Sequence, residues 1–249
     1  MDTLSGMSDV RWRPATQDDL FGRRIRELWA EQLGRRLDVL IVGCGRGEGV
    51  SADRVETRIT GIDEDLPALR AAVRARTDLA ACYLGDLRAA PLPPRAFDVV
   101  HLPFVLERIR HAELVLDRLE GTLRPGGLLL IRMRDRSSAY GLCDRMVRGR
   151  LRRVLWPRLA PRGAVGPLPA VYEPVASREG IQSYCLMRGL MISEELPGAS
   201  GPALRGPHGR LVRMVCRVVE KLSGERLPAS RDEITFVVRK PQNHFARLI

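Results

Sequence analysis

The sequence is poor in lysine and in aromatic side chains. Only two of its 41 basic residues are lysine, and Phe, Trp and Tyr together make up 5% of the 249 residues. Such scattered aromatics exclude a stacking platform for single-stranded nucleic acid, which needs several rings close together. The arginine usage fits two explanations, a coding bias toward arginine and a selected contact with an anionic partner.

Long apolar runs and paired cysteines are also missing. The apolar runs at residues 39–42 and 128–131 fall far short of the roughly 18 residues that span a bilayer, so a transmembrane protein is excluded. Residues 1–13 contain acids and no apolar core, so we expect no secretory signal and a cytoplasmic protein. The five cysteines show no C-x-x-C pair and no histidine at ligand spacing, which predicts neither a disulfide framework nor a metal site.

The formal net charge of +11 is concentrated in one segment. Residues 132–162 hold ten arginines against two acids. Basic side chains supply most of the non-specific affinity for nucleic acid, so this segment keeps RNA binding open as a hypothesis. The sequence shows no separate RNA-binding module, which makes nucleic acid the less favoured partner.

The chain divides into an N-terminal arm and a longer region of alternating elements. Residues 1–36 are predicted to form a helical arm, in which Asp18 and Asp19 cap a helix that ends at Gly34. Residues 37–249 alternate apolar strands with helices, which is typical of an α/β domain with a parallel sheet. We expect strands at 39–43, 58–63, 81–85, 98–102 and 128–133, and helices at 48–55, 65–76 and 112–123.

A basic insert follows the fifth expected strand. Pro125 and the two glycines after it end the preceding helix and turn the chain into that strand. Residues 135–175, rich in Arg and Pro, are predicted to form an irregular lid. The remaining pattern predicts a helix at 177–188 with Ser177 as its N-cap, a strand at 190–195, a helix at 209–222 and a strand at 233–239.

A glycine-rich turn directly follows the first expected strand. The run VLIVGCGRG places Gly43, Gly45 and Gly47 between a buried strand and a helix start, where missing side chains let a ligand approach the backbone. Asp63 ends the second strand sixteen residues after Gly47, near the spacing of about twenty at which an acid takes ribose hydroxyls. Asp86 follows the third strand, where a carboxylate could accept from an adenine amino group. Strand carboxyl ends meet at one crevice, so these positions should converge.

Together these motifs resemble the class I S-adenosylmethionine-dependent methyltransferases, especially the branch that methylates small molecules and lipids. The resemblance rests on the order and spacing of five runs, GCGRG at 43–47, GID at 61–63, GD at 85–86, FDVV at 97–100 and LRPGG at 123–127. It covers residues 38–134 closely and 177–240 more loosely. A dinucleotide-binding dehydrogenase is the competing interpretation, but its motif requires glycine where this chain has Glu48.

The resemblance implies a fold and a set of site residues. The fold is a Rossmann-like, mostly parallel sheet of seven strands with helices on both faces and the lid inserted after strand five. The three glycines would flank the methionine part of S-adenosylmethionine, Asp63 would hold the ribose, and Asp86 with Leu87 would hold the adenine. The full set of cofactor-binding residues is Gly43, Cys44, Gly45, Gly47, Asp63, Glu64, Asp86 and Leu87. The chain departs from the family pattern at Ile41, where members commonly carry an acid.

Candidate residues on the acceptor side are fewer. His101, at the end of the fourth expected strand, lies where family members line the substrate side and could act as a general base; a structural histidine is the alternative. A base is optional because the sulfonium already activates the methyl group. Glu107 and His111 follow on a loop, where solvated charges are expected. Further candidates, if their segments fold over the cleft, are Tyr140, Tyr172, Glu173 and His208.

The sequence therefore predicts methyl transfer from S-adenosylmethionine to an O, N or C nucleophile of a small-molecule acceptor, such as a metabolite, glycan or lipid precursor. Two alternatives stay open: an RNA methyltransferase that uses residues 132–162, and a non-catalytic scaffold, which the departure at Ile41 motivates. Residues 145–156 interleave apolar and basic side chains at roughly helical spacing. Contact with a membrane surface or an anionic substrate is one interpretation of that pattern, and an ordinary lid helix is the other. The sequence does not fix the oligomeric state.

Overall fold

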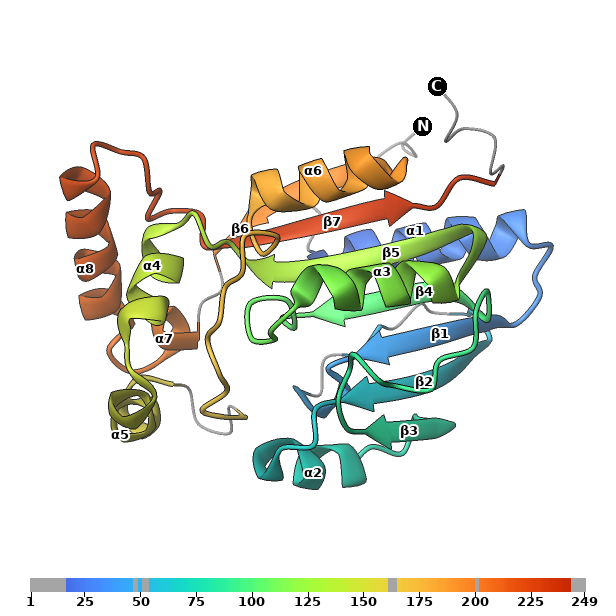
Figure 1. The fold of residues 1–249 in the computed structure, drawn as a ribbon, viewed down its shortest axis with the longest axis horizontal. Coiled ribbons are helices and arrows are strands. Elements are labelled where there is room, and N and C mark those ends of the chain that lie inside the picture. The colour runs from blue at the N-terminus through green and yellow to red at the C-terminus, as the bar shows by residue number, and fades with distance from the viewer. Residues whose placement is uncertain (1–16, 47–48, 51–53, 161–164, 200–201, 243–249) are drawn as a thin grey trace, which may run out of the picture.

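A computed structural model describes residues 17–46, 49–50, 54–160, 165–199 and 202–242 (Figure 1). Its strands are β1 (Leu37–Val42), β2 (Thr57–Asp63), β3 (Ala81–Leu84), β4 (Phe97–Pro103), β5 (Leu123–Arg134), β6 (Met191–Gly198) and β7 (Glu233–Arg239). They form one seven-stranded sheet in the order β3-β2-β1-β4-β5-β7-β6. The strands from β3 to β5 are parallel, whereas β7 runs antiparallel to both of its neighbours. The expected Rossmann-like, mostly parallel α/β sheet is confirmed.

Helices cover both faces of this sheet. The helices of the described residues are α1 (Gln17–Glu31), the 3-10 helix η1 (Cys44–Arg46), α2 (Pro67–Arg74), α3 (Ala112–Thr122), α4 (Ala139–Met146), α5 (Gly149–Leu159), α6 (Arg178–Arg188), α7 (Pro202–Arg205) and α8 (Gly209–Leu222). Helices α3 and α6 pack on one face, and α1 with part of α2 packs on the other (Figure 1). Side chains of β1 alternate between these two cores, as the two-residue period of a strand requires.

Ile41 belongs to the core on the α1 side. Its side chain is fully buried and packs in the apolar cluster that contains Phe21 and Ile25 of α1. The position at which the chain departs from the family pattern is therefore an apolar packing position. The N-terminal helix is part of the same core, because its inward side chains complete this cluster.

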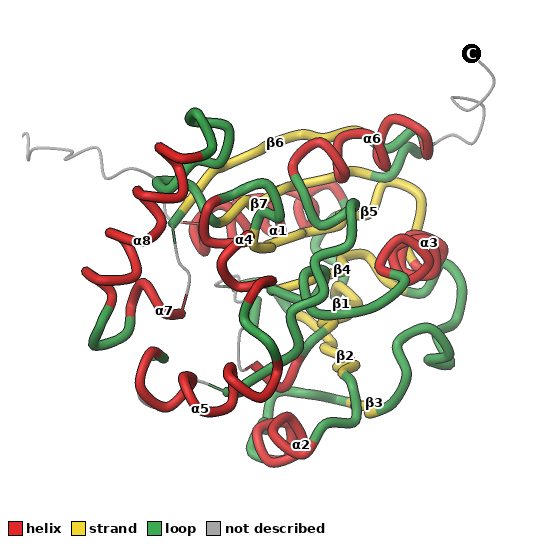
Figure 2. Tube along the Cα trace, turned by 60° about the vertical axis from the view of Figure 1, so that its left-hand side comes forward, coloured by secondary structure: helices red, strands yellow, loops and turns green. Residues whose placement is uncertain are grey.

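The segment expected to be irregular contains two helices. Helix α4 packs against α8, which the chain reaches only after β6, in a small apolar cluster that includes Tyr140 and Cys216. Helices α4, α5, α7 and α8 lie together beyond the ends of β5, β6 and β7 (Figures 1 and 2), and we call them the helical end. The prediction of an irregular stretch over 135–175 is wrong for α4, whereas the helical spacing noted at 145–156 corresponds to α5, which begins at Gly149 and buries no side chain completely.

The short helix expected at 48–55 is not seen in the described residues. Val50, Arg54 and Val55 are not helical, and the turn after β1 forms η1 instead. Residues 47–48 and 51–53 lie outside the described part of the chain. Two other predictions are confirmed to the residue, the helix at 209–222 and the strand at 233–239.

Candidate cofactor and acceptor site

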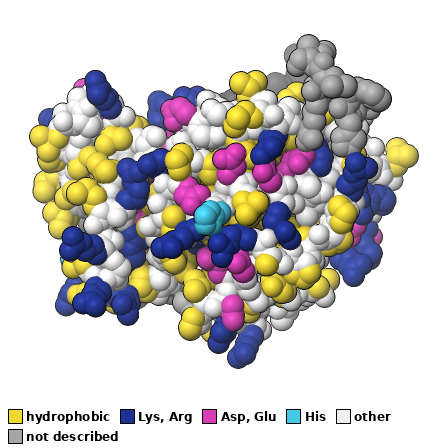
Figure 3. All heavy atoms as spheres, viewed as in Figure 1, with side chains coloured by type: hydrophobic (Ala, Val, Ile, Leu, Met, Phe, Trp, Pro, Cys, Tyr) yellow, Lys and Arg dark blue, Asp and Glu magenta, His cyan; other side chains and the backbone are white. Residues whose placement is uncertain are grey.

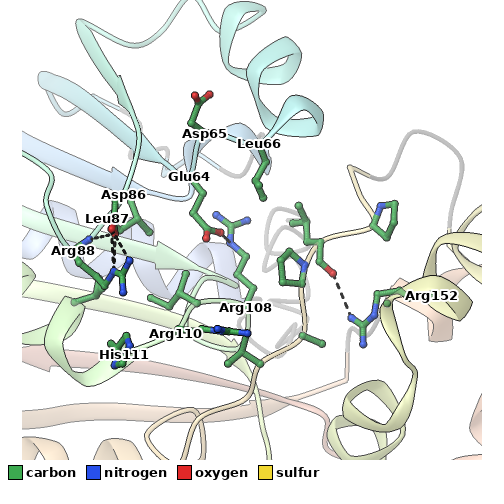
Figure 4. A pocket seen from close by; sticks show the side chains of 18 of the residues that line it. Glu64, Asp65, Leu66, Asp86, Leu87, Arg88, Arg108, Arg110, His111 and Arg152 are labelled. Carbon is green, nitrogen blue, oxygen red and sulfur yellow. Dashed lines mark hydrogen bonds and ion pairs between the residues drawn. The ribbon is translucent and has the colours of Figure 1, made fainter.

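A cleft of about 1330 Å³ opens at the carboxyl ends of β2, β3 and β4 (Figure 4). The segments that follow these strands, 64–67, 85–88 and 108–111, form one side of it. The other side is formed by α5 and by residues 167–171, which with the next two residues we call the strap. Open α/β sheets bind their ligands at this location.

Hydrogen bonds fasten the strap to the loop after β4. The backbone carbonyl of Glu107 accepts from Val171 N at 2.8 Å and from Tyr172 N at 3.0 Å. The carboxylate of Glu173 accepts from the backbone amides of His111 and the residue after it, at 2.7 and 2.9 Å. Glu173 thereby satisfies free N–H groups at the start of α3. A side chain distant in sequence thus caps this helix and holds the strap over the cleft.

Asp63 lies behind the cleft wall and organises the glycine turn. The side chain is fully buried, and its Oδ2 accepts a hydrogen bond from Gly45 N at 2.8 Å. Its Oδ1 accepts from Glu64 N at 2.8 Å and forms an ion pair with Arg108. Asp63 is thus brought to the turn as predicted, but the acid that borders the cleft is Glu64.

The turn leaves no space for larger residues at two of its glycines. Gly43 has a positive φ of 82°, and a Cβ there would lie 2.5 Å from Val105 Cγ2. A Cβ on Gly45 would lie 3.0 Å from Asp63 Oδ2. Cys44 is buried, and burial raises the pKa of its thiol to about 12. Gly47, the third predicted glycine, lies outside the described residues.

Arg108 is the residue of this site that the sequence analysis missed. Its guanidinium is 1% exposed, pairs with Asp63 through Nη2, and brings Nε within 3.5 Å of Glu64 Oε2 (Figure 4). Among the described residues, Nη1 of Arg108 and Oε2 of Glu64 have no hydrogen-bond partner. Burial raises the pKa of Glu64. Buried polar atoms without partners are costly, so this wall suits a polar ligand that would satisfy them.

Asp86 and Leu87 border the cleft beyond Glu64, as predicted (Figure 4). Arg88 contacts Asp86 through Nη2 at 2.7 Å and Nε at 2.9 Å. These charge-assisted hydrogen bonds lower the pKa of Asp86 to about 2, which keeps its carboxylate ionised. Leu87 is buried beside it and offers an apolar surface.

His101 does not line the cleft. It packs on the α1 face of the sheet, where its ring meets Phe21 edge to face at a centroid distance of 5.2 Å. Burial, with a smaller contribution from Arg132, lowers the pKa of His101 to about 3, so the imidazole is neutral. The role of His101 as a general base therefore has no geometric support in the cleft.

Glu107 joins a buried polar cluster beside the cleft. Its carboxylate lies 3.1 Å from Arg134 Nη1, and both residues are buried, so the expectation of a solvated charge is wrong. Tyr172 is also buried and donates its hydroxyl to Asp144 Oδ2 at 2.9 Å. Tyr140 lies against the same cluster, whereas His208 begins α8 away from the cleft lining.

Charge is divided unevenly across the cleft. The segments after β2 and β3 carry the carboxylates of Glu64, Asp65 and Asp86, each of which lies beside an arginine, Arg108, Arg70 or Arg88, and Arg88 itself lines the cleft. The loop after β4 carries Arg110 and His111, and α5, across the cleft from it, carries Arg152 and Arg153. Arg152 pairs with Asp144 of α4 at 3.1 Å. We call the segments after β2 and β3 the acidic half of the cleft and the loop after β4 together with α5 the basic half (Figure 4).

The described ranges contain neither a metal-binding cluster nor a membrane-spanning helix. No group of three or more His, Cys, Asp or Glu side chains there is arranged to hold a metal ion. None of the helices described has both the length and the apolarity that crossing a bilayer requires.

The strand order, the glycine turn and the acids after β2 and β3 define an α/β protein that binds a nucleotide-containing cofactor at its strand carboxyl ends. A family described as "Methyltransferase domain" matches residues 40–131. A trans-aconitate 2-methyltransferase of Methylobacterium radiotolerans is 31% identical over 183 residues, which cover 61% of this chain and 69% of that protein. The chain belongs to the S-adenosylmethionine-dependent methyltransferases, a family whose methyl donor is S-adenosylmethionine.

Two further relatives mark how far this likeness extends. A probable S-adenosylmethionine-dependent methyltransferase of Mycolicibacterium smegmatis is 34% identical over 130 residues, 50% of each chain. Several of the curated relatives are matched over only about half of their length. The crystal structure of a putative sarcosine dimethylglycine methyltransferase from Galdieria sulphuraria superposes with a TM-score of 0.56, at 13% identity, over 90% of this chain and 85% of that one. That similarity shows the fold alone.

Proposed function

We propose that this methyltransferase transfers the methyl group to a small-molecule acceptor that carries a carboxylate. The observation that carries the proposal is the division of the cleft into an acidic and a basic half. A nucleoside presents hydroxyl and amino donors, which suit the acidic half, whereas Arg110 and Arg153 in the basic half suit an anion. The relative from Methylobacterium radiotolerans is named for trans-aconitate, a small carboxylate, which is consistent with this assignment.

We assign the cofactor to the acidic half. Glu64, whose Oε2 has no hydrogen-bond partner among the described residues, would accept from the ribose hydroxyls, while Asp63 behind it braces Gly45 and Arg108. Asp86 would accept from the adenine amino group, with Leu87 against the ring. The free Nη1 of Arg108 would donate to the carboxylate of the methionine part, the one anionic group of the cofactor.

The reaction needs alignment more than acid–base help. S-adenosylmethionine supplies a methyl group on a positively charged sulfur, which makes that group ready for nucleophilic attack. Residues of the basic half would hold the acceptor in line with the carbon–sulfur bond, and water exclusion by the strap and α5 favours the attack. A carboxylate oxygen carries no proton at neutral pH, so the proposal does not depend on a base.

The test is a screen of small carboxylic acids with release of S-adenosylhomocysteine as the signal. Each candidate is compared with its neutral amide. The variant Arg110→Gln/Arg153→Gln should raise KM for the acceptor about tenfold or more, since each charge-assisted hydrogen bond contributes about 1.5–3 kcal/mol. Its control is Arg26→Gln/Arg58→Gln, which removes two exposed arginines away from the cleft and should leave KM unchanged.

Turnover of the amides at the same rate as the acids would contradict the proposal. Methylation of RNA with an affinity that falls steeply with salt would favour the RNA methyltransferase instead. In either case, cofactor affinity is also measured in the Arg110→Gln/Arg153→Gln variant. If that affinity is unchanged, the cofactor assignment stands and only the assignment of the acceptor is wrong.

A further inference from the structure

Helix α8 exposes an apolar stripe to solvent. Leu211, Met214, Val215, Val218 and Leu222 are between 45% and 83% exposed. Their spacing of three and four residues places them along one side of the helix. Single exposed apolar residues are ordinary, but five along one helix side form a contiguous surface that marks an interaction site.

Packing within the protein does not account for this stripe. A different side of α8, with Val212, Cys216 and Val219, already packs against Ala139 and Tyr140 of α4. The helix is thus anchored by one apolar side and presents a second one outward. Folding of the described residues requires only the first.

A row of cations runs along the same helix. Arg210, Arg213, Arg217 and Lys221 are all exposed and recur at helical spacing. The acid in α8, Glu220, is partly buried, and its Oε1 accepts from Ala229 N at 3.0 Å, which holds its carboxylate toward the protein. The solvent side of α8 therefore combines an apolar stripe with uncompensated positive charge.

The neighbouring helix α5 has the same character. Leu151 and Val154 are more than half exposed, between exposed arginines at positions 150, 153 and 158, and α5 contains no acid. Figure 3 shows apolar side chains gathered over α8 and basic ones below them, over α5, at the helical end. Together, α5, α7 and α8 carry nine Lys or Arg residues and one acid.

This chemistry selects among possible occupants. A second copy paired about a two-fold axis would place one cationic row of α8 near the other, and like charges disfavour that arrangement. An anionic bilayer surface offers acyl chains for the stripe and lipid headgroups for the cations. Apolar residues along one side with Lys and Arg beside them are the features of helices that lie in a membrane interface.

We propose that the helical end docks on the surface of an anionic phospholipid membrane, with the apolar stripe of α8 inserted and the cations of α8, together with Arg150 and Arg158 of α5, against the headgroups. Because α5 also lines the cleft through Arg152 and Arg153, docking brings the cleft entrance close to the lipid surface. The docking itself does not depend on methyl transfer.

The test is sedimentation of the full-length protein with vesicles of phosphatidylcholine alone and with 30% phosphatidylglycerol. We expect binding to the anionic vesicles and much weaker binding to the neutral ones. Leu211→Gln/Val215→Gln/Val218→Gln should lower the partition coefficient at least about tenfold, because inserted apolar area drives interfacial binding. Arg210→Gln/Arg217→Gln/Lys221→Gln should lower it about tenfold or more, and mainly at low salt.

Matched controls come from other faces of the protein. Leu114→Gln/Leu186→Gln/Met187→Gln removes three apolar side chains of α3 and α6 that are all more than half exposed, and Arg26→Gln/Arg58→Gln/Arg74→Gln removes three exposed arginines. Both controls should bind vesicles as the parent protein does. All the replaced side chains are exposed, so circular dichroism should show each variant folded.

Absence of vesicle binding by the folded parent protein would overturn the proposal. So would an equal loss of binding in the α3 and α6 control, which would reveal non-specific adhesion. A concentration-dependent dimer in sedimentation velocity that the α8 apolar variant abolishes would assign the stripe to a second copy instead.

Discussion

Arg108 is buried between two acids and the glycine turn. Its guanidinium pairs with Asp63 and approaches Glu64, yet Nη1 has no partner among the described residues. In the proposed arrangement this nitrogen donates to the carboxylate of the cofactor's methionine part. Arg108 would therefore contribute to binding of the amino-acid part of the cofactor and little to binding of its nucleoside.

We predict that Arg108→Met weakens S-adenosylhomocysteine binding about tenfold to a hundredfold, as expected for a lost charge-assisted hydrogen bond. Binding of 5′-methylthioadenosine, which lacks the amino-acid part, should change little. Calorimetric titration of both ligands measures this difference, and Arg110→Met is the control. An equal loss for both ligands would mean that Arg108 acts only by positioning Asp63.

His101 should make stability depend on pH. Its pKa is lowered from 6.5 to about 3 in the folded protein, so the unfolded chain binds the proton more readily. The stabilisation from a neutral His101 is complete above pH 6.5 and is lost as pH falls toward 3, by about 1.4 kcal/mol per pH unit. We predict that His101→Leu loses this slope. Urea unfolding of both proteins at several pH values between 7.5 and 4.5 tests this, and parallel curves would contradict it.

The sequence revealed the local residues of the site but not the distant pairs. Gly43, Gly45 and Asp86 could be predicted because glycine turns and strand ends produce local sequence patterns. Arg108 and Glu107 do not, since their roles depend on Asp63 and Arg134, which only the folded sheet brings near. An ion pair between residues far apart in the sequence leaves no local pattern from which it could be predicted.

At the scale of elements, helices and strands with a regular apolar pattern were predicted more accurately than surface helices without one. Helix α8 and strand β7 were predicted to the residue because their apolar residues recur at helical and at strand spacing, respectively. Ser177 was predicted as an N-cap, and its hydroxyl accepts from Gly180 N at 3.0 Å. Helix α5 was predicted only as a helical spacing over 145–156, with bounds that differ from Gly149–Leu159, because it buries no side chain fully and its arginines occupy positions that a core helix would give to apolar residues.

The glycine turn can be tested with a matched pair of variants. Gly45→Ala places a Cβ 3.0 Å from Asp63 Oδ2, so it should lower S-adenosylhomocysteine affinity at least tenfold and cost about 1–3 kcal/mol of stability. Gly121→Ala, in α3, meets no atom within 4 Å and should add about 0.5–1 kcal/mol. Titration and thermal unfolding of both variants measure these effects. Unchanged affinity in Gly45→Ala would place the cofactor away from this turn.

At the scale of the whole molecule, one cleft combines the proposed binding of the cofactor with the proposed binding of the acceptor. The carboxyl ends of β2 and β3 provide an acidic half, the loop after β4 with α5 provides a basic half, and α8 of the helical end provides an outward apolar surface. The cations that give the net charge of +11 are concentrated where the proposed anionic acceptor and the proposed anionic membrane surface would bind.

The most direct measurement is calorimetric titration of the purified protein with S-adenosylmethionine and S-adenosylhomocysteine, repeated with Asp63→Asn. Asp63 fixes both the glycine turn and Arg108, so its neutralisation should disrupt the acidic half at once. The account predicts micromolar binding that the variant loses by at least about a hundredfold. Absence of binding by the folded parent protein would contradict a working cofactor site and leave a methyltransferase fold that serves as a scaffold.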